Sequence, residues 1–316
     1  MPAASPSVIT RGAPLPFVDA LGNFFSLGNK LLFLNPRFES HRLDPELEQT
    51  VAAFIARHGI EGLQVRLNEY APLDDLRRLF VSGRVNLLLR LFFGLPMWLA
   101  VTLSCGRLFG GDHYNPYTDT VNLYSGHRAI ALHELGHVLD FRRRTFPGLY
   151  ALTRLIPGVA LYQEYLASKY AIDFLRERGM HDEELRALRL LFPAYSTYVL
   201  GAIVEFFPSA GVRALLFPVI GLGHFLGISA AMRREKELEA ERAALRPTVA
   251  AQWSEEWQET LAELSPATPH GRDLWGVFLG ATVGSALCGA GSLPGAWLGF
   301  VLARRGAARP PGRQFP

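Results

Sequence analysis

The sequence is poor in cysteine and in charge. Cys105 and Cys288 are its only cysteines, too few for a disulfide framework and consistent with a reducing compartment. Charged residues make up 19% of the chain, below the usual quarter, and the net charge is only +3. Because no basic patch with interleaved aromatic residues is present, we expect no nucleic-acid partner. The segment 1–16 lacks the basic-then-apolar pattern of a signal peptide and is expected to be a loose tail.

Apolar residues are abundant where charge is scarce. They make up 49% of the chain, and Ala214 to Met232 contains no formal charge. The stretch 191–232 is expected to form a transmembrane hairpin, with two buried core helices of a soluble protein as the alternative. Near the C-terminus, glycine recurs every fourth residue, as in helices that approach closely in lipid: Gly276, Gly280, Gly284, then Gly291, Gly295 and Gly299.

The most informative motif is His133-Glu134-Leu135-Gly136-His137, an H-E-x-x-H pattern. On a helix, histidines four residues apart lie on one face, one turn apart, and can bind one metal ion. Glu134 lies beside them, where it can take a proton from a water on that ion. The alternative is a surface helix that carries these residues without a metal.

The residues around the motif favour a strand followed by a helix. The segment 118–124 alternates polar and apolar residues, Ser125 is a good N-cap, and 129–140 has a helical pattern. Glycine in mid-helix costs about 1 kcal/mol against alanine, so we expect Gly136 to allow the close approach of a second helix. His127 is expected to be an ordinary polar surface residue.

A third ligand is expected on a later helix. Glu164 lies in the first turn of a helical pattern, and Ala167 and Ala171 share its face. Small residues there would let this helix pack against Gly136. The alternative is a solvated glutamate stabilised by the helix dipole. Asp140 is the rival carboxylate; we interpret it mainly as a group that orients a ligand histidine through a hydrogen bond.

With these residues the chain resembles the gluzincin metallopeptidases, and in style the membrane-bound CAAX-type and heat-shock-type zinc peptidases. The resemblance covers about residues 112–178. It implies a zincin-like catalytic unit in which His133, His137 and Glu164 bind Zn²⁺ and Glu134 is the general base. The chain departs from those families in a shorter interval between the second histidine and the glutamate. It also has Ser168 where they commonly have Asp.

The groups that would contact a substrate stay open. Candidates for the donor that stabilises an oxyanion are Tyr165, Tyr170 and His181, and the sequence does not rank them. Asn122 and Tyr124 lie on the strand that would border the cleft. They are candidate contacts to an extended peptide that adds to the sheet, or plain strand surface. The substrate-binding residues are therefore unknown at this stage.

An apolar stretch from Val85 to Ser104 is long enough to cross a bilayer. However, Arg90 lies inside it, and Gly94-Leu95-Pro96 interrupts it. A single crossing would also place the strand expected at 63–67 on the opposite side of the membrane from the strand at 118–124. If the two strands share a sheet, the stretch must be re-entrant, interfacial or buried, and we favour that interpretation.

We therefore expect an α+β fold that is mainly α. A zincin-like unit would consist of a small sheet, the metal helix and the third-ligand helix, with hydrophobic, membrane-embedded helical hairpins beside it. The expected divisions are an N-terminal αβ part (1–84), an apolar re-entrant or interfacial segment with a loop (85–111), the zincin helices (112–190), the transmembrane hairpin (191–232), a charged helix and loop (233–270), and a glycine-rich apolar hairpin with a basic tail (271–316).

The function expected from these features is that of a membrane-associated zinc metalloendopeptidase. Its partners would be a lipid membrane and a protein or peptide substrate, hydrolysed by a zinc-bound water that Glu134 activates. The alternatives are a soluble or peripheral zinc hydrolase and a catalytically silent membrane protein that binds metal. Arginines dominate the charge of the C-terminal tail, so by the positive-inside rule the tail and the active site are expected on the cytoplasmic side.

Overall fold

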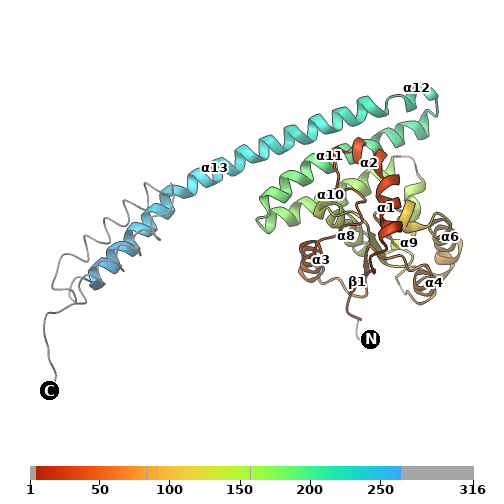
Figure 1. The fold of residues 1–316 in the computed structure, drawn as a ribbon, viewed down its shortest axis with the longest axis horizontal. Helices are drawn as coiled ribbons and strands as arrows, with labels where there is room; N and C mark the ends of the chain where they lie inside the picture. Colours follow the sequence, from red (N-terminus) through yellow and green to blue (C-terminus); the bar gives the residue numbers. More distant parts are fainter. Residues whose placement is uncertain (1–4, 83, 157, 265–316) are drawn as a thin grey trace, which may run out of the picture. The chain divides into compact units, whose positions relative to one another are not determined.

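The computed structural model describes residues 5–82, 84–156 and 158–264, with side chains described up to residue 245 (Figure 1). Two compact units divide the chain, Met1–Lys236 and Glu237–Pro316. The first unit contains the sheet and all of the helices discussed below except the end of the last one. The glycine-rich hairpin and basic tail expected at 271–316 lie outside the described residues.

A small mixed sheet organises the first unit. Its strand order is β1 (Val8–Arg11), β2 (Gln64–Leu67), β4 (Thr120–Leu123), β3 (His113–Asn115). β1, β2 and β4 are parallel, and β3 pairs antiparallel with β4. The two predicted strands are therefore neighbours, which confirms that they share a sheet.

β1 corrects the expectation of a loose N-terminal tail. Its backbone joins the sheet edge, with Val8 N–H donating to the carbonyl of Leu63 at 2.8 Å. Strand residues with branched side chains suit this pleated surface, and the short segment Val8–Arg11 gains its order from β2 rather than from a local signal.

Helices cover the sheet and complete the core. They are α3 (Pro45–Arg57), α8 (Arg128–Arg142), α10 (Val159–Glu177) and α11 (His181–Phe206). α3 begins as its sequence predicts, because the Asp44 side chain accepts the N–H of Leu47 and Pro45 occupies the first helical position. Apolar residues of all four helices, β2 and β4 share one buried cluster, so the predicted metal helix α8 lies at the centre of the fold.

The apolar stretch at 85–104 packs on this unit. It forms α5 (Leu87–Leu89), a π-helical segment (Arg90–Gly94) and α6 (Leu95–Leu103). Arg90 is buried and donates from Nη1 to the carbonyl of Leu79 at 2.6 Å. The expected interruption at Gly94-Leu95-Pro96 is a wider helical turn rather than a break. The stretch lies between β2 and β4 in the chain. Because these two strands pair in one sheet, they lie on the same side of any membrane, and the stretch does not cross it once.

The remaining described helices are short, apart from the last. They are α1 (Pro16–Phe25), α2 (Leu27–Leu32), α4 (Pro72–Val81), α7 (Gly106–Phe109), α9 (Pro147–Leu152), a 3₁₀ segment (Thr153–Leu155), α12 (Ala210–Arg213) and α13 (Leu216–Leu264). The fold is thus mainly helical with one small mixed sheet.

Two helical stretches, His181–Phe206 and Ala210–Leu245, are long and apolar enough to cross a membrane. They pack through small residues: a Cβ on Gly223 would meet Ser196 Oγ at 2.5 Å, and one on Gly227 would meet the Leu188 carbonyl at 2.8 Å. As residue numbers rise on one helix they fall on the other, so α11 and α13 run antiparallel. Small residues at such contacts are typical of helices that associate in lipid.

One expected loop is helical, and one helix runs through an expected division. The transmembrane hairpin was expected to begin at residue 191; α11 starts at His181 and continues through that position without a break, so one helix belongs both to the core and to the apolar pair. A loop was expected after the charged helix, but α13 continues to Leu264. The segment 248–264 is rich in alanine, glutamate, glutamine and leucine, which favour helix.

Candidate metal centre

His133, His137 and Glu164 converge on one point. Glu164 Oε2 lies 3.0 Å from His133 Nε2 and 3.3 Å from His137 Nε2. One ligand atom from each residue lies within 4.8 Å of the others. All three side chains are mostly shielded from solvent, and Glu164 is 1% exposed. Two residues one turn apart on α8 are thus brought to a carboxylate in the first turns of α10, as the sequence predicted.

The contact between α8 and α10 depends on Gly136. A Cβ at this position would lie 2.4 Å from the Ala167 carbonyl oxygen and 2.8 Å from Ala167 Cα. Ala167 and Ala171 are fully buried on the facing side of α10. This confirms the prediction that small residues let the two helices approach closely. The approach sets the distance between Glu164 and the histidines.

Opposite charges hold the cluster together. Burial raises the pKa of Glu164, but contacts with His137 and His133 outweigh it, so this pKa lies well below its usual range. Burial lowers the pKa of His133, but the hydrogen bond to Glu164 and the charge of Glu134 raise it more. Arg154 binds the other oxygen of Glu164, Oε1, at 2.5 Å. Glu164 is therefore ionised, with Oε2 alone directed at the histidines.

Glu134 lies beside the cluster and is anchored by backbone. Its Oε2 accepts the N–H of Tyr114 in β3 at 2.8 Å. Within the described residues its other oxygen, Oε1, has no hydrogen-bond partner. The side chain is 8% exposed and lines a cavity of about 140 Å³ together with His133 and Glu164. One carboxylate oxygen is thus fixed by the backbone, while the other is free of hydrogen bonds to the described residues.

The hydrogen bond expected between Asp140 and a ligand histidine does not form. Asp140 is fully buried, but its carboxylate binds Arg144 at 2.5 Å and the Tyr150 hydroxyl at 2.7 Å. Arg144 lies just beyond the end of α8, four residues after Asp140, and pairs with the carboxylate directly, so Asp140 turns away from the cluster. It stabilises the end of α8 instead.

Ser168 takes the position that was expected of Asp140. Its Oγ lies 3.1 Å from His133 Nδ1, one helical turn after Glu164. His137 Nδ1 is buried and has no hydrogen-bond partner within the described part of the chain. The sequence signal for Ser168 was its place in the resemblance, where the related families have Asp.

Two tyrosines of α11 are the residues that sequence reasoning missed. Tyr195 and Tyr198 line the cavity beside His133, Glu134 and Glu164. The other lining residues are Phe38, Glu39, Gly111, Asp112, Ile130, Ser168, Leu190, Leu191 and Ala194. No local pattern marks these tyrosines, because only the packing of α11 over α8 and α10 places them there.

The three earlier oxyanion candidates lie outside the cavity lining. The Tyr170 hydroxyl accepts from Arg143 at 2.8 Å, and His181 lies 3.8 Å from Glu184. Tyr165 is half exposed on α10. Tyr195 and Tyr198, which line the cavity, replace these residues as candidates for the oxyanion donor.

The two strand residues expected as possible substrate contacts are also not available at the cavity. Asn122 and Tyr124 are buried, and their polar groups bind His113 and the carbonyl of Glu69. They are structural, since β4 is an inner strand. The sheet edge nearest the cluster is β3, whose Tyr114 N–H already contacts Glu134.

Comparison of the chain with family models, curated proteins and solved structures gives no significant match.

Proposed function

We propose that this protein is a membrane-associated zinc metallopeptidase. The observation that carries the proposal is the convergence of His133, His137 and Glu164 with Glu134 beside them and a cavity in front. Two imidazoles and one carboxylate, together with an adjoining carboxylate outside the cluster, form the donor set of a catalytic rather than a structural zinc site. The resemblance to membrane-bound gluzincins points in the same direction.

The three residues fit a zinc ion. Ligands of a tetrahedral zinc at 2.0–2.1 Å are about 3.3–3.4 Å apart, and Glu164 Oε2 lies 3.0 and 3.3 Å from the two imidazole nitrogens. Ser168 accepts or donates at His133 Nδ1 and so selects the ring orientation. When bound, zinc would act as a Lewis acid and lower the pKa of a coordinated water.

The chain's own groups supply the remaining chemistry. Glu134 lines the cavity, and its Oε1 would accept a proton from the attacking water and later return it to the leaving amine. The backbone N–H of Tyr114 holds the other oxygen and keeps Glu134 in place. Tyr195 is the hydroxyl donor available to a developing oxyanion, and Tyr198 lies beside it with its hydroxyl hydrogen-bonded to Glu164. An extended peptide would lie along the exposed edge of β3.

The cavity wall connects the site to the apolar helices. Tyr195 and Tyr198 belong to α11, one of the two stretches long enough to cross a membrane. A substrate segment near the lipid surface would therefore reach the metal centre directly. We place the site on the cytoplasmic side, on the basis of the arginine-rich tail alone.

The test is to measure zinc content and hydrolysis of casein by the full-length protein in mild detergent. We expect about one zinc per chain. Glu134→Gln should keep the zinc and lose activity by at least about a hundredfold. Glu164→Ala should lose the zinc, whereas Glu177→Ala, on the exposed end of the same helix, should keep both zinc and activity.

Each other result would indicate a different function. Zinc without hydrolysis, unaffected by Glu134→Gln, would indicate a catalytically silent metal-binding protein. Zinc and hydrolysis in a protein that stays soluble without detergent would indicate a soluble hydrolase. Absence of any bound zinc would contradict the proposal.

A further inference from the structure

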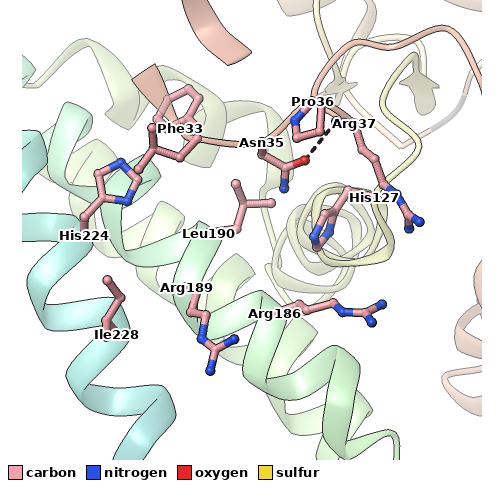
Figure 2. Close-up of a pocket in the computed structure, with 11 residues that line it drawn as sticks. Phe33, Asn35, Pro36, Arg37, His127, Arg186, Arg189, Leu190, His224 and Ile228 are labelled. Carbon is pink, nitrogen blue, oxygen red and sulfur yellow. Dashed lines mark hydrogen bonds between the residues drawn. The ribbon is translucent and has the colours of Figure 1, made fainter. Parts of the chain in front are cut away.

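A second and larger cavity, of about 440 Å³, shares only Leu190 with the lining of the cavity at the candidate metal centre. Figure 2 shows it between the segment after α2, the start of α8, and the helices α11 and α13. One side is basic and the other apolar. The lining residues are Phe33, Leu34, Asn35, Pro36, Arg37, His127, Arg186, Arg189, Leu190, His224 and Ile228.

The basic side carries positive charge that the protein leaves unbalanced. Arg186 is paired with Glu183 at 2.9 Å. Among the described residues, no carboxylate lies within ion-pair distance of Arg37 or Arg189. Both side chains are exposed and line the cavity, and in Figure 2 they extend on different sides of His127. Three guanidinium groups around one cavity favour an anion with several oxygens, such as a phosphate.

His127 adds a buried donor to this side. The residue is 6% exposed, which corrects the expectation that it is a surface residue. Its Nδ1 accepts the N–H of Ala129 and caps α8, so Nε2 carries the proton. Nε2 has no partner within the described part of the chain, and the ring lines the cavity (Figure 2). The positive end of the α8 dipole lies at the same place.

The imidazole stays neutral at physiological pH. Burial, together with the charges of Arg37, Arg186 and Arg128, lowers the pKa of His127 to about 4. A neutral ring keeps the Nδ1 acceptor that the helix cap needs and leaves one N–H for a ligand. The cavity therefore offers an uncharged donor between charged ones.

The cavity lies where both long helices change from apolar to charged. Arg189 is the last charge on α11 before fifteen uncharged residues, 190–204, and Arg233 is the first on α13 after nineteen, 214–232. Leu188 packs against Ala230 and Ala231, so these two boundaries lie at the same level. In a bilayer this level is the lipid headgroup region, where basic pockets between helices bind anionic headgroups.

We propose that this cavity binds one anionic phospholipid, with its phosphate between Arg37, Arg189 and His127. The acyl chains would lie along Phe33, Leu190 and Ile228, which form the apolar side and lead toward the exposed face of α13. A free phosphate would use only the basic side, so the apolar side and the level of the cavity favour the lipid. This inference does not depend on peptidase activity.

The experiment uses the full-length protein in an uncharged maltoside detergent. Native mass spectrometry would compare retention of palmitoyl-oleoyl phosphatidylglycerol and palmitoyl-oleoyl phosphatidylcholine, supplied in equal amounts. We expect one phosphatidylglycerol per chain, preferred about tenfold or more. Arg37→Gln/Arg189→Gln should reduce this preference about tenfold, so that this variant retains the two lipids about equally. Arg57→Gln/Arg77→Gln removes the same charge from exposed sites elsewhere and should leave it unchanged.

A second variant separates the donor from the helix cap. His127→Asn keeps a side-chain oxygen that can cap α8 but, being shorter than the imidazole, has no N–H at the position of Nε2, so it should weaken phosphatidylglycerol binding while the melting temperature is retained. Equal retention of both lipids by the wild type, or unchanged retention in Arg37→Gln/Arg189→Gln, would overturn the proposal. So would displacement of the lipid by millimolar inorganic phosphate, which would indicate a free-anion site. Displacement by hexaglutamate would indicate an acidic peptide site and would overturn it too.

Discussion

α8 and α13 are both α-helices, but they differ in which side chains are buried. Twelve of the fifteen residues of α8 are buried, among them His137, Glu134 and Asp140. In the apolar stretch Ala210–Leu245 that includes most of the described part of α13, the most apolar window is only 28% buried. α8 thus has polar groups inside the protein, and α13 has apolar groups outside it.

The difference shows what each helix must be surrounded by. A buried polar group is tolerated only where it has partners. In α8 these partners are Glu164 for the histidines, Tyr114 for Glu134, and Arg144 with Tyr150 for Asp140. An apolar helix face needs either a protein partner or lipid. Within the described residues α13 packs on α11 along one side, and Phe217, Leu222 and Phe225 remain largely exposed.

The largest effect is expected from charging the exposed face of α13. Leu222→Lys/Phe225→Lys should disfavour membrane insertion by about 5–7 kcal/mol, since each central lysine costs about 2.5–3.5 kcal/mol in a spanning helix. The measurement is the fraction that resists alkaline carbonate extraction from membranes. Leu73→Lys/Phe80→Lys changes equally exposed residues of α4 and should have little effect. Equal loss in both variants would show that α13 is not the membrane-contacting element.

The second-largest effect is expected from acid, which should destabilise the region around the start of α8. The folded pKa of His127 is lowered to about 4, so between pH 6.5 and 4 the unfolded chain binds more protons than the folded one. Its contribution to stability is therefore complete above pH 6.5 and is lost as pH falls, by up to about 3 kcal/mol. Denaturant unfolding at several pH values should show a shallower loss in His127→Asn. The same substitution at the half-buried His58 should change the slope less; identical slopes in wild type and His127→Asn would contradict this.

A smaller effect is expected from filling the space between α8 and α10. In Gly136→Ala the new Cβ would meet the Ala167 carbonyl, so we expect a loss of about 1–3 kcal/mol and weaker zinc binding. Chelator competition measures the metal affinity and thermal unfolding the stability. Gly28→Ala is the control, because no atom lies within 4 Å of a Cβ there. Zinc affinity unchanged by Gly136→Ala would mean that the helix contact does not set the ligand distances.

The smallest effect is expected at Ser168. Ser168→Ala removes the hydrogen bond to His133 Nδ1 and should weaken zinc binding about tenfold with little change in stability. Asp140→Asn should lower the stability with little change in zinc binding, since Asp140 binds Arg144 and Tyr150 rather than a histidine. The two variants, compared by zinc competition and thermal unfolding, test whether serine is the group that orients the ligand. A tenfold zinc loss in Asp140→Asn alone would reverse the assignment.

Local patterns were sufficient where chemistry and structure follow from nearby residues. The H-E-x-x-H spacing places His133 and His137 on one face of α8, because the helical repeat is local. Glu164 was found from helical periodicity and from the small residues Ala167 and Ala171 beside it. The alternation of polar and apolar residues also indicated both strands, and the structure confirms the possibility that β2 and β4 share a sheet.

Long-range packing decided the rest. Tyr195 and Tyr198 reach the cavity at the candidate metal centre only because α11 packs on α8 and α10, and no spacing in the sequence relates them to His133. Asp140 shares a helix face with His137, yet a nearer cation, Arg144, takes its carboxylate. Which of several partners a side chain binds depends on distances in the folded protein, and the sequence does not give these distances.

The sequence by itself determined which residues can bind a metal, because ligand chemistry and helical spacing are properties of a few neighbouring residues. It also determined that the apolar helices need a surrounding other than water. Only the tertiary structure decided which groups face the metal centre and that Arg37, His127 and Arg189 meet at one cavity. Those three lie on separate segments, and they come together because burial of the shared apolar core fixes α8 and α11 against each other.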